Sequence, residues 1–392
     1  MHAARPIRTA LLVAAIVGFA LNLRGPIVAV TPVLDVIGAD LRASAATVAL
    51  LVSLPVLCFG VLTPPASWLL ARAGTGRGVL IALGVLFAGT VLRSTDGLVA
   101  ALAGTVLIGG AITVGNVAVP VVIGRDLPER ANGVIALYTS ALNVGSMITL
   151  SFTAPIASAT GWRLALATWC GLVLLSAAVW WAAIRGRPDV PPLPAAAEGG
   201  SEWWRRPLVW GLSVAFAGQA FAYYGLTGWL PLILRDLTGM GPEASGVASS
   251  TFQIAAIGGA VGAPLLLRRG GATVAIGSVV AAWLVLLAGL LFAPAGWALW
   301  CAVGGVAQGG GLTVIFAMIV RGARDETENR RMSATVQGIG YTVAAAGPTV
   351  LGAVHDGSGG WTMPLLVVLG SIAVLAAAGT TAALGVRAGR TG

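Results

Sequence analysis

The residue in this sequence best placed to do chemistry is Arg24, a single charge inside an otherwise uncharged apolar run, residues 9–34. At 1.5 Å per residue, Arg24 lies about 4–5 Å from the middle of that run. If the run crosses a membrane, a charge at this depth costs at least about 2.5–3.5 kcal/mol, so it should face a cavity and have a partner. No acidic residue lies at a matching depth in another apolar run. We therefore expect Arg24 to contact an anionic substrate; the alternative is a structural arginine bound to backbone carbonyls.

A small set of amides and phenols interrupts the apolar runs and supplies hydrogen-bonding groups near the same depth. Together with Arg24, the expected substrate-binding residues are Asn22, Asn116, Asn143, Gln219, Tyr223, Gln253, Gln308, Gln337 and Tyr341. Gln219 and Tyr223 are four residues apart and share a helix face, as do Gln337 and Tyr341. Each residue alone could instead join two helices by a hydrogen bond. Their convergence on one depth favours a shared site.

The sequence contains no arrangement suited to covalent catalysis or metal binding. His2 and His355 fall in an expected tail and loop, and no catalytic triad or carboxylate pair lies in an apolar run. The chain has no lysine, which excludes a Walker-type nucleotide loop. Cys58, Cys170 and Cys301 each lie in an apolar run without metal-ligand spacing. We expect no enzyme activity, no catalytic residues, no metal and no cofactor.

The elements that position these residues must be membrane spans. The chain has 392 residues, of which 57% are hydrophobic and 9% charged, and its mean hydropathy is +0.91. A soluble domain carries about 25% charged residues, so this composition excludes a soluble enzyme or a nucleic-acid-binding domain. The apolar total suits twelve helices of about 20 residues. The uncharged stretch 270–320 is too long for one span and is expected to turn at 293–296.

The arginines predict the orientation of the spans. With twelve spans, eighteen of the 23 arginines fall on one side, and Arg42, Arg93, Arg163 and Arg235 on the other, with Arg24 inside the membrane. The arginine-rich side is cytoplasmic by the positive-inside rule. We expect a multi-pass protein of the cell membrane with both termini in the cytoplasm. The net charge of +9 is then topological and indicates no nucleic-acid partner.

The chain divides near its midpoint. Residues 186–206 form the longest polar stretch, rich in proline and glycine, and are expected to link two six-helix bundles, residues 1–185 and 207–392. Short matches recur between the halves at a shift of 195–199 residues, for example Gly161-Trp162 with Gly360-Trp361. This repeat predicts a parallel duplication with a binding site at mid-membrane between the bundles.

Several motifs resemble one transporter family. Asn22-Leu23-Arg24-Gly25-Pro26 with Thr31-Pro32, and Gly115-Asn116 with Pro120 and Arg125-Asp126, are similar to the first and fourth helices of the cyanate/nitroimidazole (CynX/NimT) family of the major facilitator superfamily. One departure is Gly25, since family members have the arginine directly before the proline. The resemblance implies an all-α major facilitator fold and a secondary or facilitative transporter.

We accordingly predict a transporter that moves a small anion, cyanate-like or organic, by alternating access. The alternatives are efflux of small drugs such as nitroimidazoles, or a non-transporting receptor on the same scaffold. The expected partners are the small anion and the lipid bilayer, and the chain is expected to be a monomer. Asp35 lies eleven residues after Arg24 on what is expected to be one helix, about 16 Å further out. We predict that no carboxylate of the protein, Asp35 included, carries a coupled proton.

Overall fold

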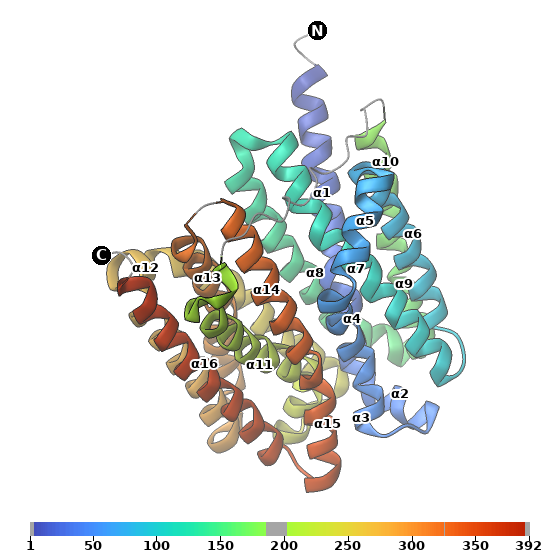
Figure 1. Cartoon of the computed structure of the whole chain (residues 1–392). Coiled ribbons are helices and arrows are strands. Elements are labelled where there is room, and N and C mark those ends of the chain that lie inside the picture. Colours follow the sequence, from blue (N-terminus) through green and yellow to red (C-terminus); the bar gives the residue numbers. More distant parts are fainter. Residues whose placement is uncertain (1–3, 186–201, 325, 389–392) are drawn as a thin grey trace.

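The computed structural model describes residues 4–185, 202–324 and 326–388, and all regular elements in this part of the chain are helices (Figure 1). The first half contains α1 (Ala4–Val28), η1 (Thr31–Val33), α2 (Leu34–Leu41), α3 (Ala45–Val48), α4 (Leu50–Val61), α5 (Thr63–Ala73), α6 (Thr75–Arg93), α7 (Leu98–Asp126), η2 (Pro128–Arg130), α8 (Ala131–Thr160), α9 (Trp162–Thr168) and α10 (Cys170–Ile184). The second half contains η3 (Glu202–Arg205), α11 (Pro207–Thr238), α12 (Pro242–Phe292), η4 (Pro294–Gly296), α13 (Trp297–Gly322), α14 (Glu326–Ala344), α15 (Ala346–Ser358) and α16 (Thr362–Ala388). The predicted all-α class is confirmed.

The helices account for the twelve predicted crossings. Among the described residues, eight helical stretches are long and apolar enough to span a membrane, and the bent pair α4–α5 makes a ninth. α12 counts once among these, yet it has two legs that meet at Gly271, where φ is +72°. α11 and the pair α14–α15 run alongside the spans within one bundle (Figure 1). Including them and the second leg of α12 gives twelve crossings.

The predicted turn at 293–296 is confirmed. α12 ends at Phe292, the short 3₁₀ helix η4 covers Pro294–Gly296, and α13 begins at Trp297. Proline has no backbone N–H and ends a helix from the preceding residue. Here the chain must reverse, and Pro294 stands where the α-helix stops.

The first span is broken, which corrects the expectation of one continuous helix from Arg24 to Asp35. α1 ends at Val28, η1 follows at Thr31–Val33, and Asp35 lies in the separate helix α2. Pro26 and Pro32 remove two backbone donors from this segment. Arg24 and Asp35 therefore lie in different helices, α1 and α2, of one candidate span, Thr9–Leu41.

Arg93 is a second arginine buried among the helices, which the sequence placed in an outer loop. Arg93 is the last residue of α6, and its side chain is wholly buried. Its Nη1 donates a hydrogen bond of 2.6 Å to the carbonyl of Pro26. The last carbonyls of a helix have no intrahelical donor. Arg93 thus caps α1 near the break, and the structure assigns it a packing role rather than a place in a solvated loop.

One contact is repeated in the two halves and supports the predicted internal repeat. The indole N–H of Trp162 donates to Asp40 at 3.2 Å, and that of Trp361 donates to Asp236 at 2.9 Å. Each pair joins the outer end of the first span of its half, in α2 or α11, to the start of the last span, where Trp162 begins α9 and Trp361 directly precedes α16. His355, expected in a loop, lies instead in the last turn of α15 and stacks on Trp361, with ring centroids 4.0 Å apart.

The two halves touch on the side that the arginine distribution makes extracellular. Asp35 and Arg235 form an ion pair of 2.6 Å between α2 and α11. Ser53 of α4 and Thr349 of α15 share a hydrogen bond of 2.9 Å, and Ser158 of α8 donates to Glu243 of α12 at 2.7 Å. Most of the predicted linker, residues 186–206, lies outside the described residues, and the division at 185 and 207 remains a prediction.

Candidate functional site

A cavity of about 620 Å³ lies between the two halves, beyond those contacts toward the cytoplasm. The first half contributes α1, α4, α5, α7 and α8 to its wall, and the second contributes α11, α13 and α14. From Arg24 it extends past Pro64, Pro120 and Ala334, which lie in the cytoplasmic halves of their spans, α4–α5, α7 and α14–α15. The molecule is therefore closed on the outer side and hollow on the inner side.

Arg24 stands at the deep end of this cavity. Its Nη1 donates to the side-chain oxygen of Asn143 at 3.2 Å, and its guanidinium carbon lies 5.3 Å from the ring centre of Tyr223. Among the described residues this is the only hydrogen bond of the Arg24 side chain. A guanidinium has five N–H donors. Most of them remain available to a ligand.

A glycine allows Asn143 to reach Arg24. The backbone of α8 comes so close to α1 that a Cβ at Gly145 would overlap the carbonyl oxygen of Leu21. Small residues permit this approach between membrane helices. Asn143, two residues earlier on α8, is 9% exposed and also donates to the carbonyl of Thr139 at 3.1 Å, which fixes its amide.

A small recess of about 20 Å³ continues from Arg24 into the second half. Gln219 forms part of its wall. The indole N–H of Trp283 donates a hydrogen bond to the side-chain oxygen of Gln219 at 3.1 Å. The side-chain nitrogen of Gln219 donates in turn to the backbone carbonyl of Gln308 at 3.2 Å. The side-chain oxygen of Gln308 is buried without a hydrogen-bond partner among the described residues. A buried polar atom without a partner costs about 1–3 kcal/mol. Gln308 thus lines the recess with Arg24 and has one buried side-chain oxygen without a partner among the described residues.

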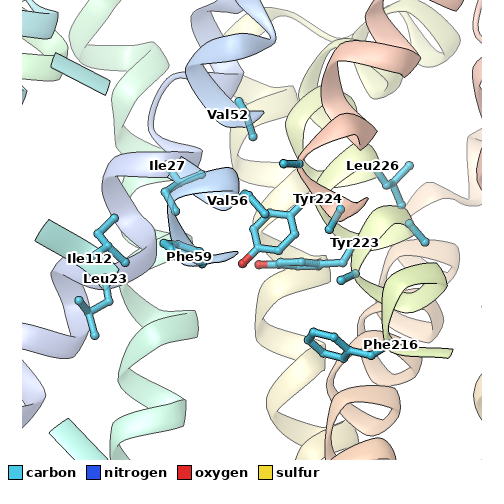
Figure 2. Close-up of a cluster of buried hydrophobic side chains, with 14 of the residues drawn as sticks. Leu23, Ile27, Val52, Val56, Phe59, Ile112, Phe216, Tyr223, Tyr224 and Leu226 are labelled. Atoms are coloured by element: carbon cyan, nitrogen blue, oxygen red, sulfur yellow. The ribbon is translucent and has the colours of Figure 1, made fainter. Parts of the chain in front are cut away.

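Tyrosines surround the charge. The chain has four tyrosines, and all of them, Tyr138, Tyr223, Tyr224 and Tyr341, line the cavity or the recess together with Arg24. Tyr223 and Tyr224 pack edge to face with centroids 4.8 Å apart. Figure 2 shows the phenolic ends of both pointing from α11 toward the helices of the first half. Of these rings, that of Tyr223 lies beneath the guanidinium, a position that favours a cation.

The structure brings most of the predicted site residues together around Arg24. The wall of the cavity includes Arg24, Asn116, Gln337 and Tyr341, and that of the recess Arg24, Gln219, Tyr223, Gln308 and Tyr341. Two others stand behind the wall: Asn143 accepts from Arg24, and Gln253 accepts from the Tyr223 hydroxyl at 3.4 Å.

Asn22 lies elsewhere. It is buried against α10, where it donates to the hydroxyl of Ser176 and to the carbonyl of Gly18, both at 2.9 Å. It lines neither the cavity nor the recess. Its contacts are those of a residue that joins two helices.

Two tyrosines at the site were missed by the sequence analysis, Tyr138 and Tyr224. Both line the cavity, together with Phe59 and Phe316. The sequence contained a signal for them, because the chain has only four tyrosines and all four fall inside predicted spans. Among the described residues no group of histidine, cysteine or carboxylate side chains could hold a metal ion.

Residues 10–348 match the family model described as Major Facilitator Superfamily. The chain belongs to the Major Facilitator Superfamily. It is 31% identical to an uncharacterised transporter of Bacillus subtilis (strain 168), YycB, with 94% of this chain and 92% of that one covered. It is 30% identical to the 2-nitroimidazole transporter and 25% identical to the cyanate transport protein CynX, both of Escherichia coli (strain K12), with about nine tenths of each chain covered.

A solved structure shows the same fold. The chain superimposes on a bacterial homologue of the human lysosomal transporter Spinster, crystallised inward-facing and unoccupied, with a TM-score of 0.76, 17% identity, and 96% and 97% of the two chains covered. The predicted resemblance to cyanate and nitroimidazole transporters is confirmed by the relatives' names. This superfamily member is a multi-pass transporter of the cell membrane, and its relatives are transporters rather than enzymes.

Proposed function

We propose that this superfamily member carries a small organic anion across the cell membrane and that Arg24 binds the negative charge. One observation supports this most directly. Arg24 is the only charged residue among the described residues that line the cavity and the recess, and its one hydrogen bond goes to a neutral amide. A charge that is partly removed from water and lacks a counter-ion favours binding of an opposite charge.

Alternating access follows from the arrangement of the halves. Substrate enters the cavity from the cytoplasm and meets Arg24 near mid-membrane. To release it outward, the halves must close around Pro64, Pro120 and Ala334 and separate at the outer contacts. Rocking of two bundles about a fixed site is the mechanism expected for a duplicated fold.

The second candidate is export of a neutral drug-sized molecule. A relative is named a 2-nitroimidazole transporter, and the cavity wall is rich in apolar side chains such as Phe59, Leu312 and Phe316. A neutral substrate leaves Arg24 without a counter-ion throughout the cycle. Loss of Arg24 would then change transport little, which separates the two candidates.

Substitution of Arg24 tests the proposal. Purified protein in liposomes would be assayed for uptake of labelled small organic anions, with Arg24→Ala expected to lower uptake at least tenfold. Arg24→Lys keeps the charge but not the planar bidentate geometry, so we expect an intermediate loss. Arg269→Ala is the matched control, because Arg269 is an exposed arginine on the cytoplasmic side.

Two outcomes would contradict the proposal. Anion uptake by Arg24→Ala at the wild-type rate would show that Arg24 does not bind the substrate. Failure of Arg24→Ala and Arg24→Lys to fold, seen as aggregation in detergent, would show that Arg24 is structural.

A further inference from the structure

Aromatic side chains are concentrated around Arg24. Aromatic residues make up 7% of the chain, yet four tyrosines and three phenylalanines line the cavity and the recess: Tyr138, Tyr223, Tyr224, Tyr341, Phe59, Phe216 and Phe316. Such a lining is not needed to hold a small inorganic anion, for which amide and hydroxyl donors suffice.

Tyr341 of α14 is the centre of these rings. Its centroid lies 5.5 Å from that of Phe59, 5.2 Å from Phe216 and 6.3 Å from Tyr224, each pair edge to face. Phe59 belongs to the first half and the others to the second, so the rings bridge the halves beside the charge. Aromatic rings attract one another in this geometry beyond the effect of area burial. A planar aromatic ligand fits this environment.

The two compartments differ in size in a way that suits a ligand with a small head and a larger body. The recess of about 20 Å³ holds one water-sized group, whereas the cavity of about 620 Å³ is in the range of organic ligand sites. Both compartments share Arg24, Tyr224, Leu312 and Tyr341. A ligand can therefore place one polar atom in the recess while the rest of it stays in the cavity.

Gln308 gives the recess a second ligand-binding group, independent of Arg24. Its side chain is 4% exposed, and its oxygen has no partner among the described residues. Gln308 lines the recess together with Arg24, and the side-chain nitrogen of a glutamine is a hydrogen-bond donor. A carboxylate has two oxygens, so one can lie in the recess beside Gln308 while the other meets the guanidinium from the cavity.

We propose that the substrate is an aromatic monoanion, with its carboxylate-like group between Arg24 and Gln308 and its ring beside Tyr341, Phe59 and Tyr224. This rests on the proposed anion transport and names the substrate class of that site. A single guanidinium without another lining cation selects one negative charge over two. The absence of acidic residues among the described lining residues disfavours amines.

A matched set of four probes tests the inference on the purified full chain. Benzoate and cyclohexanecarboxylate have the same charge and similar size but differ in aromaticity. Acetate has the charge without the ring, and benzamide has the ring without the charge. Binding would be measured by ligand-induced thermal stabilisation and by uptake into proteoliposomes. We expect benzoate to bind roughly two- to tenfold more tightly than cyclohexanecarboxylate, the ratio that an aromatic contact provides.

Variants of Tyr341 test whether the difference in affinity between benzoate and cyclohexanecarboxylate arises at this site. Tyr341→Leu should abolish the preference for benzoate, and Tyr341→Phe, which keeps the ring, should retain it. Phe292→Leu removes a ring that is 85% exposed at the end of α12, far from the cavity, and should leave the ratio unchanged.

The outcomes separate this inference from the proposed function. Equal affinities for benzoate and cyclohexanecarboxylate, or transport of acetate but neither ring compound, would overturn the aromatic inference and leave anion transport standing. Binding of benzamide as tight as that of benzoate would overturn anion transport itself. Absence of binding or transport for all four probes would overturn both.

Discussion

At the scale of single residues, the two buried arginines show how well the position of an arginine along an apolar run predicts its place in the structure. Arg24 stands in an uncharged run, so its position inside the membrane was predictable. Arg93 is followed by polar residues, so the sequence suggested a loop, yet its side chain turns inward to the carbonyl of Pro26. The direction of a long side chain at a helix end depends on its neighbours in space, which the sequence does not give.

Arg93 is expected to affect stability rather than transport. Arg93→Ala leaves the Pro26 carbonyl without its donor and opens a void, which should lower the free energy of unfolding by about 2–4 kcal/mol. Arg93→Met fills most of the void and should lose only about 1 kcal/mol. Thermal denaturation in detergent measures both, and uptake per folded molecule should stay near wild type. Normal stability with lost uptake would contradict this assignment.

Asn143 is expected to position Arg24 for its ligand. Asn143→Ala removes the hydrogen bond at 3.2 Å and should raise the KM for the transported anion about fivefold, with little change in kcat. Asn143→Asp should be far more damaging, since a carboxylate there pairs with Arg24 and repels the anion. A merely structural Asn143 predicts equal losses for both variants.

Asn22 provides the control for that experiment and illustrates an avoidable error. It lies two residues from Arg24, and residues at that spacing do not share a helix face. Both were nevertheless predicted to belong to one site. Asn22→Ala should cost about 1 kcal/mol of stability through the lost contact with Ser176, and the KM per folded molecule should not change. A raised KM for Asn22→Ala would show that Asn22 belongs to the substrate-binding site.

At the scale of helices, glycines determine how closely two neighbouring helices pack. α12 and α13 pack so closely that a Cβ at Gly259 would overlap the carbonyl oxygen of Val306, whereas nothing lies within 4 Å of one at Gly258. Gly259→Ala should therefore lower stability by about 1–3 kcal/mol. Gly258→Ala, at the neighbouring position, should be neutral or stabilise by up to about 1 kcal/mol through helix propensity. Comparison of the two melting temperatures checks the prediction; equal shifts would contradict it.

Helix ends were predictable where proline or composition marks them, and breaks inside apolar runs were not. The turn at Pro294 followed from a run too long for one membrane crossing. The break between α1 and α2 contains Pro32, but prolines also stand inside helices of this chain, such as Pro26 in α1 and Pro120 in α7, so a proline alone did not mark the break. The pairs Trp162–Asp40 and Trp361–Asp236 escaped notice because their partners lie more than a hundred residues apart.

At the scale of the whole molecule, the outer contacts determine which side of the site is closed. Asp35 and Arg235 join the halves with their side chains 33% and 27% exposed. An ion pair of this kind contributes about 1 kcal/mol at most. This is small for folding but matters for two states of similar energy, where about 1.4 kcal/mol changes their ratio tenfold. Asp35→Asn and Arg235→Gln should therefore shift the population toward the outward-open state.

The shift can be measured at Ser53, which lies in the outer contact and is 4% exposed. Ser53→Cys, in a background without the other three cysteines, should react slowly with a membrane-impermeant thiol reagent added from outside. Removal of either member of the pair should speed the reaction severalfold. Exchange of the charges, Asp35→Arg with Arg235→Asp, should restore the slow rate. An unchanged rate in both single variants would show that the pair does not hold the outer side closed.

The ion pair also sharpens the prediction about energy coupling. If Asp35 alternately bound and released a transported proton, Asp35→Asn would abolish accumulation against a gradient while substrate binding stayed normal. If it is a contact between the halves, the same change alters the rate of transport but leaves the final accumulation ratio under a pH gradient close to wild type. We expect the second result, because Asp35 is held by Arg235 at 2.6 Å in the inward-facing state and lies outside both the cavity and the recess. The decisive measurement is the steady-state ratio of labelled anion inside and outside proteoliposomes at imposed pH differences. A ratio that falls to one in Asp35→Asn, with unchanged affinity, would make Asp35 the proton carrier.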